Sequence, residues 1–405
     1  MVKYGRRNAL VYSALIGIVG TAITIYDNSF WAIIIGRLIY GFSVGIIAIA
    51  MPRLMEESVP GNLVGFYGGL YCLSFAAATL IAYALAVFLP PDSDIEGLKE
   101  THVTQVVFGL PIVFYVIQLI LQFTYFRRDS VKFLLLNGKQ FEAEQEIMKI
   151  YSRANDASEA SQIAVDLMRS VQKQTSQVSI PELFNRTYIG GTGVALIIMA
   201  LHELTAINAI LLYSNTIIEG MPDGSITPRE GTYLIGVFNF ISSAVSLYSA
   251  RAFTRRFLFI GGHFGMGLCH LAIGLFILIN KPTIALISIF LFLFCFQNTS
   301  GAITWLYCSE VAVDSALGFV GTSGYACIFV LTLTIQPLMD SAIGQAGTFF
   351  IFGVISIVGA VWCHIYLKET SKGLTDKEKK SLYIPEDIKA QMGIESPSNI
   401  TSSFT

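Results

Sequence analysis

Several side chains that could do chemistry lie inside long apolar segments of this sequence. One segment contains a histidine, a glutamate and an asparagine, and two later segments contain further amides and an indole. Polar groups are costly inside a lipid bilayer, so a functional role is expected for them. Asparagine and glutamine donate and accept hydrogen bonds without charge, although they can equally serve only to bridge two helices. The side chains in question are His202, Glu203, Asn208, Asn239, Gln297 and Trp305.

Other kinds of chemistry have no support in the sequence. It contains no constellation of a nucleophile, metal ligands or a phosphate loop. The six cysteines all fall in apolar runs without paired spacing, so neither a disulfide framework nor a zinc site is expected. The glycine run from Gly36 to Gly45 suits close helix packing and lacks the Lys-Ser/Thr of a nucleotide loop. We therefore expect no enzyme activity, no metal and no cofactor. The formal net charge of -2 also gives no reason to expect a nucleic-acid partner.

The composition indicates a membrane protein. Apolar residues make up 54% of the chain and charged residues 13%, about half of the roughly 25% found in soluble proteins. The charges crowd between apolar runs that are long enough to cross a bilayer as helices of about 20 residues. We predict ten spanning helices, at 8–26, 30–51, 64–89, 104–126, 187–214, 231–250, 257–280, 283–308, 317–338 and 346–367.

The distribution of positive charge predicts an orientation for these ten spans. Of the 26 Lys and Arg residues, 22 fall on the side that carries both termini, three fall on the other side, and Arg37 lies within a span. Cytoplasmic loops of membrane proteins carry the excess of Lys and Arg. Both termini are therefore expected on the cytosolic side, or in the matrix if the membrane is mitochondrial.

The chain is predicted to divide into four segments. Four spans come before a central polar loop and six come after it. Within that loop, 141–151 and 163–171 place apolar residues at helical spacing, which predicts short intracellular amphipathic helices. The polar C-terminal tail is expected to be disordered by composition. The predicted domains are a half-bundle over 1–126, the loop over 127–186, a six-helix bundle over 187–367 and the tail over 368–405.

An ordered set of loop motifs resembles the sugar-porter branch of the major facilitator superfamily over essentially the whole chain. Each motif alone is weak, but together they fall between the right spans and on the right side of the membrane. The motifs are Gly5-Arg6-Arg7, Gly36-Arg37, Pro52 with Glu57 and Pro60, Arg128-Asp129-Ser130, Leu204-Thr205-Ala206-Ile207-Asn208, Gly301-Ala302-Ile303-Thr304-Trp305, Ser309-Glu310, and Lys368-Glu369-Thr370-Ser371-Lys372-Gly373.

This resemblance implies an all-α integral membrane protein with the major facilitator fold. In that family the Gly-Arg-Arg motif lies between the second and third of twelve helices. Here the motif begins at Gly5. The resemblance therefore implies that this chain lacks the first two helices and that its ten spans match the third to the twelfth.

The resemblance also implies a site for a neutral sugar at the middle of the membrane, between the two halves of the fold. Amide and indole groups hold the sugar there in the family. By position, Asn208, Asn239, Gln297 and Trp305 match or nearly match these groups. Further positions depart from the family pattern: the paired glutamines are His202-Glu203, another expected glutamine is Cys72, an expected glycine is Ala206, and two expected prolines are Ala302 and Thr304.

The resemblance further implies that charged residues at the cytosolic helix ends form a gate that locks one conformation. Several of their partners are missing, because arginines expected after two acidic motifs are Val64 and Leu317, and an expected acid is Arg251. A network that keeps only some partners should switch poorly, since switching needs two balanced states. The charges assigned to this gate are Arg6, Arg7, Arg37, Glu57, Arg255, Arg256 and Glu310.

Two functions are compatible with this pattern. One is a facilitative transporter for a hexose-like sugar, which the retained Asn208, Asn239 and Trp305 support. The other is a former transporter that serves as a structural subunit of a larger membrane complex. The altered pocket, the altered gate and the two absent helices favour it, so the prediction is this structural subunit, with the working transporter as the alternative. The expected partners are lipid, other membrane-protein subunits in the gap of the two helices, and a neutral sugar. The membrane is expected to be the plasma membrane or the mitochondrial inner membrane.

Overall fold

The computed structural model is helical, and the residues that it describes form ten helical segments long and apolar enough to cross a membrane. Their bounds differ from the predicted runs by only a few residues, so the prediction of an all-α protein with ten spans is confirmed. The described residues contain no β-strand. They are 5–26, 29–59, 63–90, 94, 96–97, 101–150, 178–219, 227–371, 374 and 376–391.

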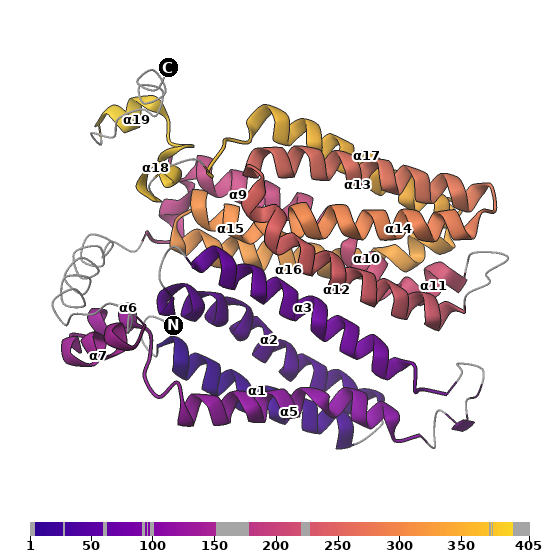
Figure 1. The fold of residues 1–405 in the computed structure, drawn as a ribbon, viewed down its shortest axis with the longest axis horizontal. Helices are drawn as coiled ribbons and strands as arrows, with labels where there is room; N and C mark the ends of the chain where they lie inside the picture. The colour runs from indigo at the N-terminus through magenta and orange to yellow at the C-terminus, as the bar shows by residue number, and fades with distance from the viewer. Residues whose placement is uncertain are drawn as a thin grey trace. The chain divides into compact units, whose positions relative to one another are not determined.

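The chain divides into two compact units, residues 1–71 with 88–176 and residues 72–87 with 177–405. The helix that contains residues 64–86 belongs partly to each unit, a division that the pattern of apolar runs could not show. The helices that contribute to the first unit are α1 (Arg6–Tyr26), α2 (Phe30–Ser58), the start of α3 (Val64–Ala86), α5 (Val103–Thr124), α6 (Val131–Leu136) and α7 (Gln140–Ile150) (Figure 1).

Small residues set the packing of α1 against α2 in the first unit. A Cβ added to Gly20 would lie 2.6 Å from the Tyr40 nitrogen, and one added to Gly36 would lie 2.7 Å from the Gly20 oxygen. Glycine permits such close backbone contact between membrane helices. Gly36 therefore packs as its position in the glycine run predicts. Gly41 and Gly45 do not, because a Cβ at either position would meet no described atom within 4 Å.

The second unit contains the last six spans, two of which are interrupted. Its core includes fully buried Phe259, Phe292 and Tyr307. The elements are η1 (Pro181–Phe184), α9 (Ile189–Leu204), α10 (Ile207–Leu212), α11 (Ser214–Glu219), α12 (Pro228–Ala252), α13 (Arg255–Leu278), α14 (Pro282–Phe296), η2 (Gln297–Gly301), α15 (Ala302–Val311), α16 (Asp314–Asp340), α17 (Gly344–Tyr366), α18 (Asp376–Ser381) and α19 (Glu386–Gln391).

The second half of α3 packs within this second unit. The Tyr83 hydroxyl donates a hydrogen bond to the Leu211 carbonyl. A Cβ added to Gly236 of α12 would lie 2.7 Å from the Tyr83 ring, so the glycine makes room for the tyrosine. These contacts explain why residues 72–87 group with the later helices.

The polar segments are more ordered than their composition predicts. The expected amphipathic helix at 141–151 is present as α7, which buries Ala143 and Ile147, whereas the one expected at 163–171 lies outside the described residues. The prediction of a disordered tail is wrong for 376–391, which form α18 and α19. The Tyr383 hydroxyl lies 2.6 Å from the Tyr307 hydroxyl of α15, so contacts with the spans of the second unit order this part of the tail.

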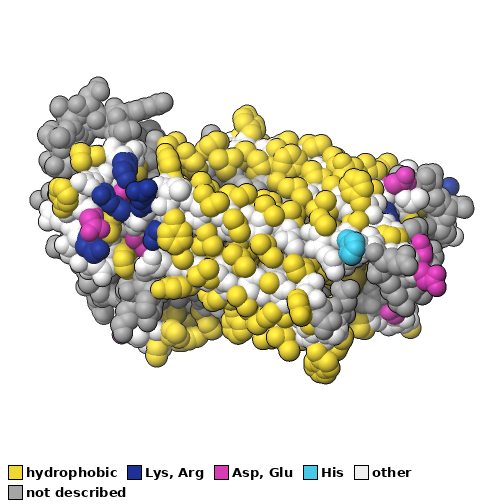
Figure 2. Space-filling model, turned by 90° about the horizontal axis from the view of Figure 1, so that it is seen from below, with side chains coloured by type: hydrophobic (Ala, Val, Ile, Leu, Met, Phe, Trp, Pro, Cys, Tyr) yellow, Lys and Arg dark blue, Asp and Glu magenta, His cyan; other side chains and the backbone are white. Residues whose placement is uncertain are grey.

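Exposed side chains follow the pattern expected of a protein surrounded by lipid. Hydrophobic side chains cover the middle of the face shown in Figure 2, and charged side chains gather toward its two ends. On α5, for example, Val113, Phe114 and Ile120 are all more than half exposed. Exposed apolar surface of this extent suits contact with hydrocarbon chains and not with water.

Candidate functional site

A break in the fifth span separates α9 from α10 at Thr205 and Ala206. Ala206 has a left-handed backbone, with φ 62° and ψ 23°, which is unfavourable for a residue with a Cβ. The break leaves the Thr205 carbonyl without a helical partner, and His270 Nε2 of α13 donates to it at 2.8 Å. The Thr205 hydroxyl donates to the His202 carbonyl at 2.7 Å. Because buried backbone groups need partners, these contacts stabilise the break.

A π-helical turn, η2, interrupts the eighth span. Its residues, Gln297–Gly301, are polar or small, and two of their side chains bond to carbonyls one turn back. The Thr299 hydroxyl donates to Cys295 O at 2.5 Å, and Asn298 Nδ2 donates to Phe294 O at 2.9 Å. Side chains that take helical carbonyls in this way compete with the backbone ladder. π-turns are frequent at functional sites, and this one carries a predicted binding residue.

Two predicted residues form a buried pair that we call the amide pair. Gln297 Nε2 of η2 donates to Asn239 Oδ1 of α12 at 2.7 Å. Asn239 is fully buried and Gln297 is 7% exposed. Asn239 Nδ2 finds no acceptor among the described residues, and an unmet buried donor costs about 1–3 kcal/mol. The amide pair can therefore offer a donor to the oxygen of an uncharged ligand.

Three other predicted residues lie at the break in the fifth span. Asn208 Nδ2 donates to Glu203 Oε2 at 2.7 Å, and we call these two residues the acid–amide pair. His202 Nε2 lies 4.0 Å from Glu203 Oε1. The other ring nitrogen of His202, Nδ1, is 3.0 Å from the Ser300 hydroxyl of η2. The turn η2 therefore bonds Asn239 through Gln297 and His202 through Ser300.

Trp305 and Cys72 lie at the edges of this arrangement. The Trp305 side chain is 43% exposed and lies against α16, where a Cβ at Gly321 would be 3.2 Å from the indole. Cys72 Sγ lies 3.8 Å from the Gly301 carbonyl at the end of η2. A thiol is a weaker and shorter hydrogen-bonding group than the glutamine that the family resemblance predicts there.

Three predicted gate charges of the first unit, Arg6, Arg7 and Glu57, lie in what we call the first end cluster. The Asp129 carboxylate accepts from the backbone nitrogens of Arg6 and Arg7 at 3.0 and 3.1 Å. Arg6 Nη2 donates to Glu57 Oε1 at 2.8 Å, and the Ser130 hydroxyl donates to the other Glu57 oxygen. Carboxylates are favourable at helix N-termini because the first backbone N–H groups lack helical partners. Asp129 thus caps α1, while Glu57 holds the Arg6 side chain.

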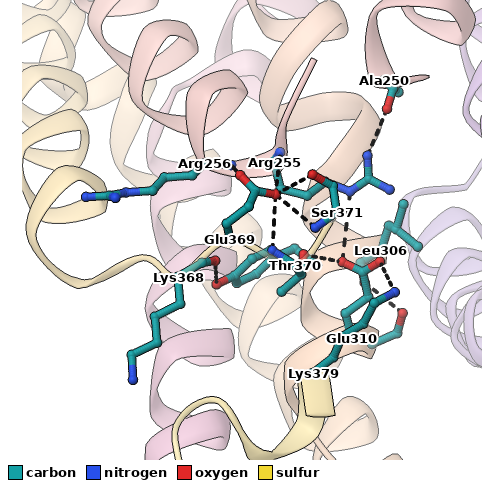
Figure 3. A network of polar contacts seen from close by, with 12 residues as sticks. Ala250, Arg255, Arg256, Leu306, Glu310, Lys368, Glu369, Thr370, Ser371 and Lys379 are labelled. Carbon is teal, nitrogen blue, oxygen red and sulfur yellow. Dashed lines mark hydrogen bonds and ion pairs between the residues drawn. The ribbon is translucent and has the colours of Figure 1, made fainter. Parts of the chain in front are cut away.

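The second end cluster repeats this layout at the start of α13 (Figure 3). The Glu369 carboxylate accepts from the backbone nitrogens of Arg255 and Arg256 at 3.1 and 3.0 Å. It also accepts from Ser371 N at 2.9 Å. Glu369 therefore caps α13 as Asp129 caps α1.

Glu310 takes the place in the second end cluster that Glu57 has in the first. Its Oε2 accepts from the Thr370 hydroxyl at 2.6 Å and lies 3.9 Å from Arg255 Nε. Its Oε1 accepts from Lys379 Nζ of α18 at 3.1 Å. The second cluster thus has a lysine from the tail that shares the acid with Arg255.

Arg37 lies apart from both end clusters. Its guanidinium group is 4.6 Å from the centre of the Phe108 ring and 5.8 Å from that of Tyr40. At 1.5 Å per residue, the length of α2 between Arg37 and Glu57 is about 30 Å. The structure therefore groups Arg37 with aromatic rings at the opposite end of α2, and not with the other predicted gate charges.

Of the three positions at which the sequence departs from the family's gate, the structure describes the side chain of one. Leu317 packs, partly buried, against the core of the second unit. The side chains of Val64 and Arg251 lie outside those that are described. Glu57 and Glu310 keep cations at 2.8 and 3.1 Å, so each end cluster retains an ion pair.

The second end cluster should weaken in acid because of Glu369. Burial raises the pKa of Glu369, but hydrogen bonds from Ser371, the Arg256 backbone and Thr254 outweigh this and hold its pKa at about 2, below the ordinary 4.5. The carboxylate therefore stabilises the fold fully above about pH 4.5, and this contribution is lost as the pH falls toward 2. Between about pH 5 and pH 3, the melting temperature of the native protein in detergent should fall further than that of Glu369→Gln, which cannot titrate. An equal fall in both proteins would contradict this.

The left-handed backbone at Ala206 predicts an unusual response to glycine. Ala206→Gly loses a buried methyl group worth about 0.8 kcal/mol but relieves strain of about 1–2 kcal/mol. The free energy of unfolding should therefore change by less than about 1 kcal/mol. The matched control is Ala195→Gly, also fully buried but inside α9, which should lose about 1–2 kcal/mol. Unfolding in detergent measures both; equal losses would show that the break is absent.

Several residues of these sites were not singled out by the sequence. Asp129 and Glu369 belong to the sequence motifs, but the motifs do not mark them as helix caps. Each follows the last span of its unit and precedes a hydroxyl residue, and this recurrence is the signal that could identify them. Ser300 and His270 lie within spans and carry no comparable signal. His270 could be recognised only from the break that it stabilises.

The sequence of this chain is similar to those of known transporters. A family model described as "Sugar (and other) transporter" matches residues 1–381. The chain is 23% identical over 394 residues to hexose transporter 1 of Plasmodium yoelii yoelii, covering 92% of this chain and 76% of that protein. It is 26% identical over 381 residues to the glucose transporter GlcP of Staphylococcus epidermidis, covering 91% and 80%.

Solved structures show the same fold. The proton:xylose symporter XylE bound to 6-bromo-6-deoxy-D-glucose superposes with a TM-score of 0.77 at 18% identity, covering 93% of this chain and 83% of the symporter. XylE from E. coli in a partially occluded, inward-open conformation gives a TM-score of 0.75 at 19% identity, covering 92% and 83%. The ten spans therefore adopt the fold of the major facilitator superfamily.

Proposed function

This chain belongs to the sugar (and other) transporter family, and on that premise we propose that it carries a small neutral sugar across a membrane. The amide pair is the observation that carries the proposal. Asn239 and Gln297 are buried between α12 and η2 and bonded at 2.7 Å. A sugar hydroxyl both donates and accepts hydrogen bonds, so it can satisfy the unpaired Asn239 Nδ2 without bringing charge into the bundle.

The neighbouring residues fit the same class of ligand. Asn208 lies beside the break in the fifth span, and interrupted helices are a common feature of binding sites in transporters. Trp305 offers a flat apolar surface with a single donor, which suits a sugar ring that has both apolar and hydroxyl-bearing faces. We therefore propose Asn208, Asn239, Gln297 and Trp305 as substrate-binding residues, with the end clusters acting as the gate.

A second candidate is a membrane protein that keeps this fold but no longer transports and serves as a subunit of a larger complex. Glu203 and His202 favour it, because an acid and a histidine stand where the family resemblance predicts neutral amides. The strained Ala206, at a predicted glycine, adds to this. The relatives named above are described as transporters, however, and both end clusters keep their ion pairs. We therefore place transport first.

Uptake by the purified chain in liposomes tests the proposal. Saturable entry of radiolabelled D-glucose or D-xylose, faster than that of L-glucose and absent from protein-free liposomes, would support transport. The second candidate predicts no stereoselective uptake. It also predicts that mild-detergent extraction from the native membrane gives a large particle with fixed partner proteins.

A further inference from the structure

We propose that Glu203 is a proton-binding site inside the membrane, so that the sugar transport proposed above is coupled to proton movement. Glu203 is the second-last residue of α9, the first part of the interrupted fifth span, and is 5% exposed. One oxygen, Oε2, accepts a hydrogen bond from Asn208. The other, Oε1, lies 3.8 Å from where a Cβ would stand on Gly324 of α16. The carboxyl group is therefore enclosed by protein.

No fixed cation among the described residues of the second unit neutralises this carboxyl group. The helix α9 packs against α15, α16, α17, α10 and η1. From α16, the Tyr325 phenol and the Cys327 thiol lie close enough to interact with Glu203 electrostatically; both are ordinarily neutral at neutral pH. From α10 comes the Asn208 amide, which is always neutral. The described residues of α15, α17 and η1 form no ion pair with Glu203.

Histidines are the remaining titratable neighbours. His202 Nε2 lies 4.0 Å from Glu203 Oε1, and its Nδ1 is engaged with Ser300. His263 of α13 lies near His202, and His270 of the same helix donates to the Thr205 carbonyl. A histidine is not a fixed charge, since its imidazole is neutral until it binds a proton. The Glu203–His202 neighbourhood is therefore a place where a proton can be held or released.

A charged carboxylate without a cation is costly in such surroundings. The penalty for burying an unpaired ion is several kcal/mol, and ionisable groups within membrane spans typically mark ion or proton pathways. Binding a proton removes the charge and leaves one carboxyl oxygen as a hydrogen-bond donor and the other as an acceptor. The bond from Asn208 can persist in that form, so the protonated state needs no other change in the described contacts.

Protonation of Glu203 can change how firmly α9 and α10 are held together. The hydrogen bond from Asn208 to Glu203 spans the break at Thr205 and Ala206, joining the end of α9 to the start of α10. Loss of the proton would place a charge beside that junction and strengthen the bond, because hydrogen bonds to ionised groups are stronger. Protonation therefore alters the contact that holds the two parts of this span together.

Infrared difference spectroscopy of the purified full chain in nanodiscs tests the proton site directly, without sugar. A band from a protonated carboxyl group that appears on acidification and is missing in Glu203→Gln is the expected result. The variant Glu203→Asp, which keeps a carboxyl group, should shift this band without removing it. The matched control is Glu142→Gln on α7, a partly exposed carboxylate 3.6 Å from Lys139 Nζ, which should leave it unchanged. If Glu203→Gln has the same difference spectrum as the native chain, the proposal is overturned.

Uptake measurements then separate this proposal from the transport function on which it rests. With an acidic exterior, the native chain should accumulate D-glucose, by up to about tenfold for a difference of one pH unit if one proton moves with each sugar. Glu203→Gln should equilibrate D-glucose without accumulating it. Uptake that ignores the pH gradient in both proteins would overturn the coupling. A Glu203 infrared band without uptake of any sugar would support the proton site and count against the transport function.

Discussion

Replacing Asn239 with leucine should lower sugar uptake per folded protein by about ten- to one-hundredfold. Leucine has the same branched arrangement of four side-chain heavy atoms as asparagine but removes both the unpaired donor and the acceptor that Gln297 uses. Each lost hydrogen bond to a ligand hydroxyl costs about 0.5–1.5 kcal/mol, and leaving Gln297 unpaired in the site adds to the loss. Since 1.4 kcal/mol corresponds to tenfold, initial uptake rates in liposomes, corrected for folded protein, measure the effect.

Asn298→Leu is the control for this substitution, because Asn298 is buried in the same turn and bridges helices. Ser249 of α12 donates to its Oδ1 at 2.9 Å, so the change should reduce stability by about 1–3 kcal/mol. Uptake per folded protein should remain within about twofold of the native chain. If the two variants lose uptake equally, then Asn239 acts only as a bridge between helices and the proposed site is wrong.

Arg6→Met should destabilise the first unit by about 3 kcal/mol or more, because it removes the cation 2.8 Å from the buried Glu57. Replacing both partners, Arg6→Met with Glu57→Met, should recover most of this loss, since apolar pairs often replace buried ion pairs at little cost. Arg6 Nε and Nη1 also lack partners among the described residues, so the arginine itself is expensive to bury. Unfolding of the purified variants in detergent, followed by tryptophan fluorescence, measures the cycle.

Arg255→Met in the second end cluster should cost less, about 1 kcal/mol. Arg255 lies 3.9 Å from Glu310, which keeps Lys379 at 3.1 Å and the Thr370 hydroxyl at 2.6 Å. Lys379→Met combined with Arg255→Met should therefore cost more than the sum of the two single changes, because only the double variant leaves Glu310 without either cation. A loss at Arg255 as large as that at Arg6 would show that the tail lysine contributes nothing.

The ten spans could be predicted from the sequence because each rests on a local property, an apolar run of sufficient length. The interruptions within two of those runs could not be predicted in the same way. At Ala206 the backbone takes a conformation that alanine disfavours. His270 stabilises it by a contact with the Thr205 carbonyl, 65 residues away in the chain. Tertiary contacts of this kind override local propensity.

The residues of the candidate site could be predicted from their chemical type and from the family resemblance, but their pairing could not. Asn239 and Gln297 could be proposed from their positions, and the structure brings them together. That Asn208 bonds Glu203 could not be foreseen, nor that Arg37 lies with aromatic rings. Residue pairing depends on which helix faces meet, and a spacing along the chain does not specify this. The tail helices were missed for a similar reason, because contacts such as Lys379 with Glu310 order a segment whose composition is polar.

The carboxylate caps also bear on how the chain is made. The first turn of α1 is capped by Asp129, 123 residues after Arg6, and that of α13 by Glu369, 114 residues after Arg255. At about 5–20 residues per second, each cap is synthesised roughly 6 to 25 s after the helix that it closes. Until then the exposed N–H groups must be satisfied by water or by the insertion machinery. Each unit can therefore reach its final form only after its last span has left the ribosome, and pauses in translation before residues 129 and 369 would prolong the period in which the nascent helices remain uncapped.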